Sequence, residues 1–371
     1  MRKSVQSYRG EEERSMLIRK LKDPLTNMEI QAVGNPGVDT GQNYFTAQTW
    51  LADSRHILLC TDIDENKMGR YVRFDTETGA METLLEDLSW GCGIISANDL
   101  FYYYVGSTIY EYNLHTQLCR TVCSLEPGTQ LYGPLSINND GRVLGVYWNR
   151  GDDWVIGTVQ VDTGAVTEVA APGFQEPYPI ANHSMINPQY DHLVFFAHEG
   201  NTEHIADRIY VADTTTSEIR NVFPQQRLDT GEHVEYVGHE MWAADGEHLY
   251  FVKYPQSPLK PTGVYRVEKW GKEWELINGD YRYWHVAPSP DGRFAVADTF
   301  EEGMQVSKIV LIDLETRVSK LLCEQPLWRD HPGHPHPMFS PDSKKLSFTF
   351  ADEDHHLWIG VIDLDQISEE D

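Results

Sequence analysis

Three histidines lie within six residues of one another near the C-terminus. They belong to the run His-Pro-Gly-His-Pro-His-Pro at 331–337. Imidazole is the commonest metal ligand in proteins, and proline restricts the backbone around it. In an extended segment, residues i and i+2 point to the same face, so His334 and His336 would share a ligand face. The run therefore favours a metal or catalytic site over a polar loop whose histidines face water.

The elements that must hold these residues follow a repeat. A short turn rich in Asp, Asn and Gly precedes an apolar strand, and a second strand then ends in an acidic or turn residue. The clearest copies are Ser-Pro-Asp-Gly at 289–292 and Ser-Pro-Asp-Ser at 340–343. Seven such turns lie near 53, 98, 140, 190, 245, 291 and 342, at intervals of 42 to 55 residues. This is the period of a four-stranded propeller blade.

The chain shows no amphipathic helix longer than a few turns, which excludes alternating strand-helix folds. We therefore predict an all-β fold, a seven-bladed β-propeller, with residues 1–371 forming a single domain. Residues from about 15 to 34 precede the first unit. Because a closed ring leaves no free sheet edge, we expect them to complete the last blade and close the ring.

The histidines fall at one point of this repeat. Of the 15 histidines in the chain, 13 lie at or after position 183. His183, His239, His285 and His336 each precede a repeated turn by about six or seven residues. Equivalent positions of a rotationally repeated fold converge on the axis, so these side chains are expected to face one cavity. The alternative is that each is a hydrogen-bonded polar residue at the start of a strand.

Charge and composition narrow the possible partners. The formal net charge of −27 argues against nucleic acid and against an anionic membrane surface as partners. It leaves room for a small anionic substrate, because a local cation can reverse the potential inside one cleft. The five cysteines are odd in number and lack metal-type spacing, and the N-terminus lacks the apolar stretch of a signal peptide. We therefore expect a cytoplasmic protein with reduced thiols.

Other residues are less distinctive. Arg208 begins an expected strand and could neutralise a carboxylate, although a surface arginine would look the same. His198 and Glu199 follow an apolar strand, where a plain loop role is favoured. The motifs GxSxG, Walker A, GxGxxG and HExxH are absent, so serine hydrolase, nucleotide-binding and zincin functions lack their usual signatures.

Several segments together resemble the oligogalacturonate lyases, a family of cytoplasmic seven-bladed propellers that act on pectin fragments. The matching segments are Gln-Asn-Tyr-Phe at 42–45, Tyr-Gly at 132–133, Ala-Asn-His at 181–183, His-Glu-Gly at 198–200, Asp-Arg at 207–208, His-Glu-Met-Trp at 239–242 and His-Pro-His-Pro at 334–337 with the following Phe-Ser-Pro-Asp. Each motif is short, but their order and spacing are fairly specific. The remainder of the first blades matches poorly.

The resemblance implies a role for each matching residue. His239 would be the catalytic base, and Arg208 would bind and neutralise the substrate carboxylate. Metal ligands, expected to hold manganese, would be His285, His334 and His336. Tyr44, His183 and His198 are expected to contact the substrate.

The family has a glutamine where this chain has His331, which we take as a possible fourth ligand. A fourth imidazole would favour zinc, nickel or cobalt more than a glutamine oxygen does.

The implied reaction is β-elimination on a short acidic oligosaccharide, an oligogalacturonide or a related uronide. The C5 proton is poorly acidic while the adjacent carboxylate is charged, so a divalent cation and an arginine would stabilise the enediolate that develops. A neutral histidine is a suitable base at cytosolic pH. Two alternatives stay open: a propeller that binds partners without catalysis, and a three-histidine zinc hydrolase.

Overall fold

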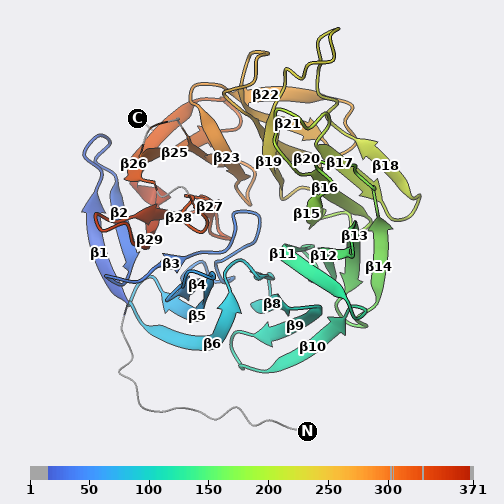
Figure 1. Cartoon of the computed structure of the whole chain (residues 1–371). Helices are drawn as coiled ribbons and strands as arrows, with labels where there is room; N and C mark the ends of the chain where they lie inside the picture. The colour runs from blue at the N-terminus through green and yellow to red at the C-terminus, as the bar shows by residue number, and fades with distance from the viewer. Residues whose placement is uncertain (1–15, 301–302, 304, 328–329, 368–371) are drawn as a thin grey trace.

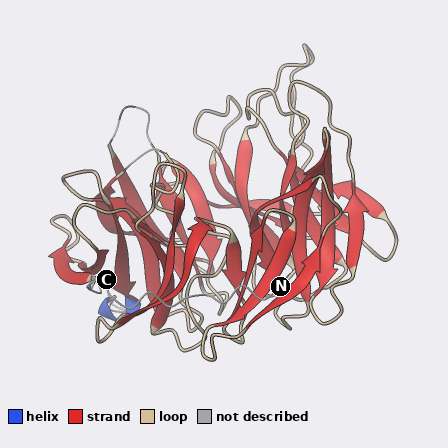
Figure 2. Ribbon diagram, turned by 60° about the horizontal axis from the view of Figure 1, so that its bottom comes forward, coloured by secondary structure: helices blue, strands red, loops and turns tan. Residues whose placement is uncertain are grey.

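The computed structural model describes residues 16–300, 303, 305–327 and 330–367. They form seven antiparallel sheets arranged around a central axis, and the chain passes once around the ring (Figure 1). The all-β, seven-bladed propeller expected from the sequence is confirmed. Among the described residues the single helical element is one short turn, Leu364–Gln366, drawn in blue in Figure 2. No described helix has the length and apolar character needed to cross a membrane.

Each of six sheets uses four consecutive strands, with the first next to the axis and the last at the rim (Figure 1). The first three are β3 (Thr40–Gly41), β4 (His56–Thr61), β5 (Met68–Asp75) and β6 (Met81–Ser89); β7 (Gly93–Ile95), β8 (Leu100–Val105), β9 (Thr108–Asn113) and β10 (Cys119–Ser124); and β11 (Thr129–Ile137), β12 (Val143–Arg150), β13 (Asp153–Gln160) and β14 (Val166–Ala170). The next three are β15 (Ala181–Ile186), β16 (Leu193–His198), β17 (Ile209–Asp213) and β18 (Glu218–Asn221); β19 (Val237–Trp242), β20 (His248–Lys253), β21 (Gly263–Glu268) and β22 (Trp274–Asn278); and β23 (Tyr283–Pro288), β24 (Phe294–Thr299), β25 (Val306–Asp313) and β26 (Ser319–Pro326).

The seventh sheet joins the two ends of the chain. Its order is β1-β2-β29-β28-β27, from β1 (Leu17–Lys22), β2 (Glu29–Gly34), β27 (Met338–Phe339), β28 (Lys345–Ala351) and β29 (Leu357–Asp363). The N-terminal segment that was expected to close the ring thus supplies the two outer strands, with Val33 opposite Ile359. Residues 1–15 lie outside the described part, including the expected start of this segment and the stretch examined for a signal peptide.

Apolar side chains hold neighbouring sheets together. In the described residues, seven buried clusters lie one between each pair of adjacent sheets. The cluster that joins the last sheet to the first contains Val33, Trp50, Phe74 and Ile359, none more than 1% exposed. Burial of such side chains from both sheet faces explains the short apolar strands of the sequence.

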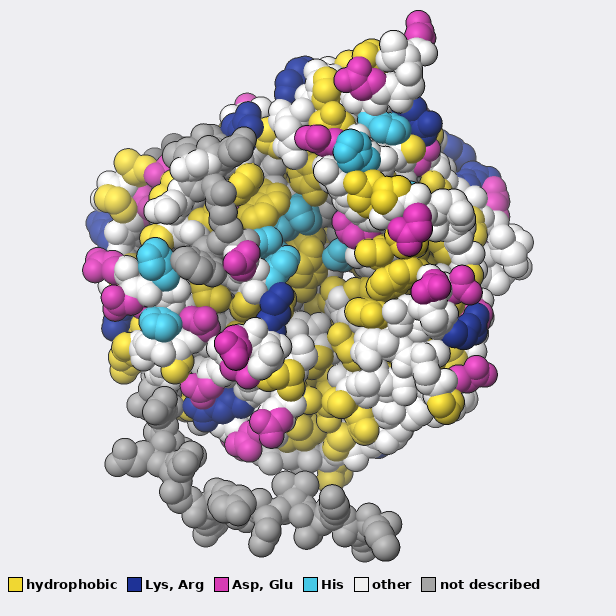
Figure 3. Space-filling view, in the orientation of Figure 1, with side chains coloured by type: hydrophobic (Ala, Val, Ile, Leu, Met, Phe, Trp, Pro, Cys, Tyr) yellow, Lys and Arg dark blue, Asp and Glu magenta, His cyan; other side chains and the backbone are white. Residues whose placement is uncertain are grey.

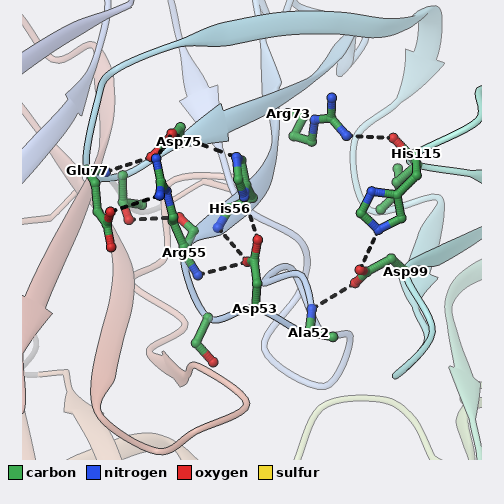
Figure 4. Close-up of polar contacts among 12 residues, drawn as sticks. Ala52, Asp53, Arg55, His56, Arg73, Asp75, Glu77, Asp99 and His115 are labelled. Carbon is green, nitrogen blue, oxygen red and sulfur yellow. Dashed lines mark hydrogen bonds and ion pairs between the residues drawn. The ribbon is translucent and has the colours of Figure 1, made fainter.

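The seven repeated turns all connect the first strand of a sheet to the second, and many bind the next sheet. In Figure 4 the Asp99 carboxylate accepts the backbone N–H of Ala52 from the preceding sheet at 2.7 Å and contacts His115 at 2.7 Å. In the Ser-Pro-Asp turns the serine hydroxyl donates to the aspartate, at 2.6 Å for both Ser289 and Ser340. The recurring Asp, Asn, Gly and Ser-Pro-Asp motifs of the sequence therefore form turns, and many of these turns bind one sheet to the next.

Candidate metal centre and adjoining pocket

Irregularities in the innermost strands turn the histidines toward the axis. The pairing register of β15, β19 and β23 shifts across the residues that contain His183, His239 and His285. His183 and His239 have positive φ angles of 52° and 56°, and His336 has one of 46°. A bulge redirects side chains, and non-glycine residues in this conformation cluster at functional sites. The common sequence offset thus corresponds to backbone distortions at these positions, a register shift at three of them and a positive φ angle at three.

His285, His334 and His336 form a group that can hold a metal ion. One ring nitrogen from each lies within 4.8 Å of the others. The Nε2 atoms of His285 and His336 are buried and accept no hydrogen bond from any described residue. Burial, helped by the neighbouring imidazoles, holds the pKa of both residues well below the usual range, so both are neutral. Neutral, converging and unpaired nitrogens are the donor set of a divalent transition metal.

A buried aspartate, Asp298 of β24, orients two of these ligands. Its carboxylate oxygens lie 2.8 and 2.9 Å from His285 Nδ1, and they accept the backbone N–H groups of His285 and His336 at 2.8 and 3.2 Å. When Asp298 is ionised, the contact places the proton of His285 on Nδ1 and leaves the Nε2 lone pair for a metal. Burial raises the pKa of Asp298 to about 8, against the lowering effect of the His285 N–H.

Asp298→Asn is expected to weaken metal binding about 10- to 100-fold, the usual effect of losing a carboxylate behind a histidine ligand. The amide keeps the size of the side chain, but it can present an N–H to His285 Nδ1. The change is measured directly by titrating the metal-free protein with Mn²⁺ while monitoring the electron paramagnetic resonance signal of the free ion. An affinity equal to that of the unmodified protein would show that Asp298 does not orient the ligands.

His331 lies beside the three ligands but outside their group. Its ring centroid is 3.9 Å from that of His334 and 5.1 Å from that of His336. The ring stacks on Trp90 at 5.7 Å. Burial lowers the pKa of His331 to about 3, with further contributions from His334 and Lys67. The structure therefore places the expected fourth imidazole as a neighbour of the centre, between the ligands and the indole.

His239 lies beside the metal-binding group, and one of its ring nitrogens is already hydrogen-bonded. Its ring centroid is 3.9 Å from that of His285. Its Nδ1 lies 2.5 Å from the carbonyl oxygen of Trp284 and 3.0 Å from the hydroxyl of Tyr254. A carbonyl oxygen only accepts, so Nδ1 carries the proton and Nε2 carries the lone pair. Burial, then His285 and Arg208, hold the pKa of His239 well below its usual range, so the residue is a neutral base.

Arg208 is buried between two carboxylates, those of Glu240 and of Glu199, for which the sequence had favoured a plain loop role. Its Nε donates to Glu240 at 2.7 Å, and its Nη1 and Nη2 donate to Glu199 at 3.1 Å each. Burial opposes the charge, but Glu199 and Glu240 raise the pKa of Arg208 well above its usual value. Burial likewise opposes the charge of Glu199, but Arg208 and His183 hold its pKa well below the usual range. Arg208 thus lies in the site with its charge already balanced by neighbouring side chains.

A pocket of about 430 Å³ opens beside these residues. Its lining includes Tyr44, Lys67, Trp90, His183, Glu199, Arg208, His239, Tyr254 and His331. Figure 3 shows several histidine side chains in the hollow at the centre of this face, with a basic side chain beside them. Tyr44 packs over the centre, 4.6 Å from the His336 ring and 5.6 Å from the His183 ring.

The structure does not bring His198 into the pocket lining. Its ring stacks on Phe174 at 3.7 Å, and its Nε2 contacts the carbonyl oxygen of Tyr178 at 2.8 Å. The next residue, Glu199, lines the pocket instead, because successive residues of a strand point to opposite faces.

Comparison with known proteins agrees with the fold. No family model matches the chain. A curated oligogalacturonide lyase from Pectobacterium atrosepticum is 23% identical over 368 residues, covering 88% of this chain and 91% of the relative. A solved oligogalacturonate lyase in complex with manganese has a TM-score of 0.82 at 20% identity, covering 96% of this chain and 97% of that one.

A second solved oligogalacturonate lyase, from Vibrio parahaemolyticus, has a TM-score of 0.81 at 19% identity and covers 96% of this chain and 98% of its own. These matches extend well beyond the segments that carried the resemblance in the sequence. The similarity of this chain to the oligogalacturonate lyases is therefore confirmed over nearly its whole length.

Proposed function

We propose that the protein is a metal-dependent lyase that cleaves short oligogalacturonides by β-elimination. The observation that carries this proposal is the neutral His239, with its proton fixed on Nδ1, beside three histidines that can hold a metal. The relatives support the same reading, since they are described as oligogalacturonide lyases and one was solved with manganese.

His285, His334 and His336 would hold the metal, with Asp298 behind two of them. A bound Mn²⁺ supplies a Lewis acid that makes the C5 proton of a uronate more acidic and stabilises the negative charge left behind. Three imidazoles would also accept zinc, nickel or cobalt. We favour manganese because it is the ion in the solved relative.

The remaining steps of the reaction are assigned to side chains of the pocket. His239 Nε2 takes the C5 proton, and the C5–H electrons form the new double bond to C4. The C4–O bond breaks with its electrons passing to the leaving oxygen, which takes up a proton from water as the shortened saccharide is released. The Trp284 carbonyl oxygen keeps the imidazole in the tautomer that can accept this proton. Tyr254 fixes the ring from a second direction. Arg208 is held by Glu199 and Glu240 in the wall of the pocket, with its charge balanced by these two carboxylates.

Removing the metal tests this proposal. Treating the purified protein with a chelator should abolish the formation of unsaturated uronides from digalacturonate, which is followed by their ultraviolet absorbance. Added Mn²⁺ should restore this activity. Elemental analysis of the same sample reports whether the ion was removed. Full activity at zero metal content would overturn the proposed role of the three histidines, and saturated products would favour the zinc hydrolase. The cytoplasmic location stays a prediction.

A further inference from the structure

The two cationic side chains of the pocket, Arg208 and Lys67, differ in whether acidic residues already bind them. Arg208 binds both Glu199 and Glu240, whose carboxylate oxygens accept four hydrogen bonds from the guanidinium at 2.7 to 3.4 Å. An uncompensated cation in the lining is Lys67, which forms no ion pair with any residue in the described ranges. A substrate carboxylate that reaches this wall of the pocket therefore meets an ammonium group that no described acid holds in an ion pair.

The backbone of Lys67 is firmly placed. It lies in the tight connection between β4 and β5, with a φ angle of 61°. The Asp64 carboxylate accepts the N–H groups of Asn66 and Met68 at 2.8 Å each, and the Lys67 N–H donates to the Asp64 carbonyl oxygen at 2.9 Å. The Lys67 carbonyl oxygen accepts the N–H of Trp90 at 2.7 Å. Lys67 is thus fastened both to its own turn and to the neighbouring pocket wall.

Trp90 supplies an aromatic surface at the same place. Its indole N–H donates to the Gln42 carbonyl oxygen at 2.7 Å, and its ring stacks on His331, which in turn lies 3.9 Å from His334. The order outward from the metal ligands is therefore His331, then Trp90 with Lys67, and these last three residues line the pocket. A sugar held at the ligands would place its neighbour in the saccharide against Trp90.

We propose that Lys67 and Trp90 form a second uronate subsite, in which Lys67 binds the carboxylate of the sugar that adjoins the one at the metal centre. This inference rests on the proposed function. It explains how a protein with a net charge of −27 can select a short uronide: one carboxylate goes to the metal centre, the next to a single ammonium, and a longer polyanion meets the acidic surface beyond.

The test combines a change in the protein with a change in the substrate. Lys67→Met is expected to raise the KM for digalacturonate about tenfold, with kcat changed less than about twofold, because the reacting sugar keeps all its contacts. Lys67→Arg should restore most of the affinity. Lys344→Met, which removes an equal charge from an exposed turn after β27, should behave as the unmodified protein. With a digalacturonate whose adjoining carboxylate is a methyl ester, Lys67→Met should no longer differ from the unmodified protein.

Binding of digalacturonate to the Mn²⁺-loaded protein, measured by calorimetry, separates this inference from the proposed reaction. Binding without turnover that is weakened by Lys67→Met would keep the subsite and overturn the lyase function. Turnover in the unmodified protein with an unchanged KM in Lys67→Met would keep the lyase function and overturn the subsite. Absence of both binding and turnover would overturn both.

Discussion

His239→Gln is expected to lower kcat for digalacturonate by about 10²- to 10⁴-fold, the range for loss of a general base. The amide has a similar size and can still donate to the Trp284 carbonyl oxygen, but it cannot accept the C5 proton. Metal content should not change, because His239 is not in the ligand group. Steady-state kinetics at saturating substrate, with elemental analysis of the same sample, measures both quantities.

His192→Gln is a suitable control, since His192 lies in the connection between β15 and β16 and outside the pocket lining. It should retain full activity and metal. If His239→Gln keeps the kcat of this control, another group must remove the proton. If it loses metal instead, His239 acts as a ligand.

Arg208→Met is expected to destabilise the folded protein by about 3–5 kcal/mol, the cost of leaving buried charges without their partner. The side chain of Arg208 is 5% exposed and that of Glu240 is 2% exposed, so water cannot take over the lost contact to Glu240. Glu199 and Glu240 would then repel each other across the gap. The midpoint of urea unfolding, compared with that of the unmodified protein, measures the loss.

The double variant Arg208→Met with Glu240→Leu provides the internal control, because it removes one of the two stranded carboxylates. It should be more stable than Arg208→Met alone, and together with the single variant Glu240→Leu the three stability changes give the coupling between the two residues. A single variant as stable as the unmodified protein would mean that the ion pairs do not hold this wall of the pocket, and Arg208 would then be free to bind substrate.

The repeated turns made the fold predictable. Each Asp/Asn/Gly turn fixes the step from the first strand of a sheet to the second, and turn chemistry is local enough to be read from a few residues. Two of the first strands, β3 and β27, were not visible in the sequence, because they have only two residues each. Their place depends on packing around the axis and not on a strand-like pattern.

The histidines could be predicted for the same reason, since they keep a constant distance from the turns. The acidic residues that contact the site, Asp298 and Glu240, could not be predicted in this way. Asp298 meets His285 because the register of β23 against β24 shifts between Tyr283 and Val286, and Glu240 meets Arg208 across two sheets. One signal was available: Asp298 is an isolated acid in the apolar strand Phe294–Thr299, where a buried charge requires a partner.

The central claim is that this pocket breaks a glycosidic bond by elimination, and the source of oxygen in the products tests it most directly. Digalacturonate should be cleaved by the Mn²⁺-loaded protein in water enriched in heavy oxygen, and both products analysed by mass spectrometry. Elimination adds no water, so we predict one unsaturated uronide and no heavy oxygen introduced by bond cleavage, after correction for exchange at the reducing end. Two saturated galacturonates with heavy oxygen incorporated at the cleaved bond would show hydrolysis and contradict the account.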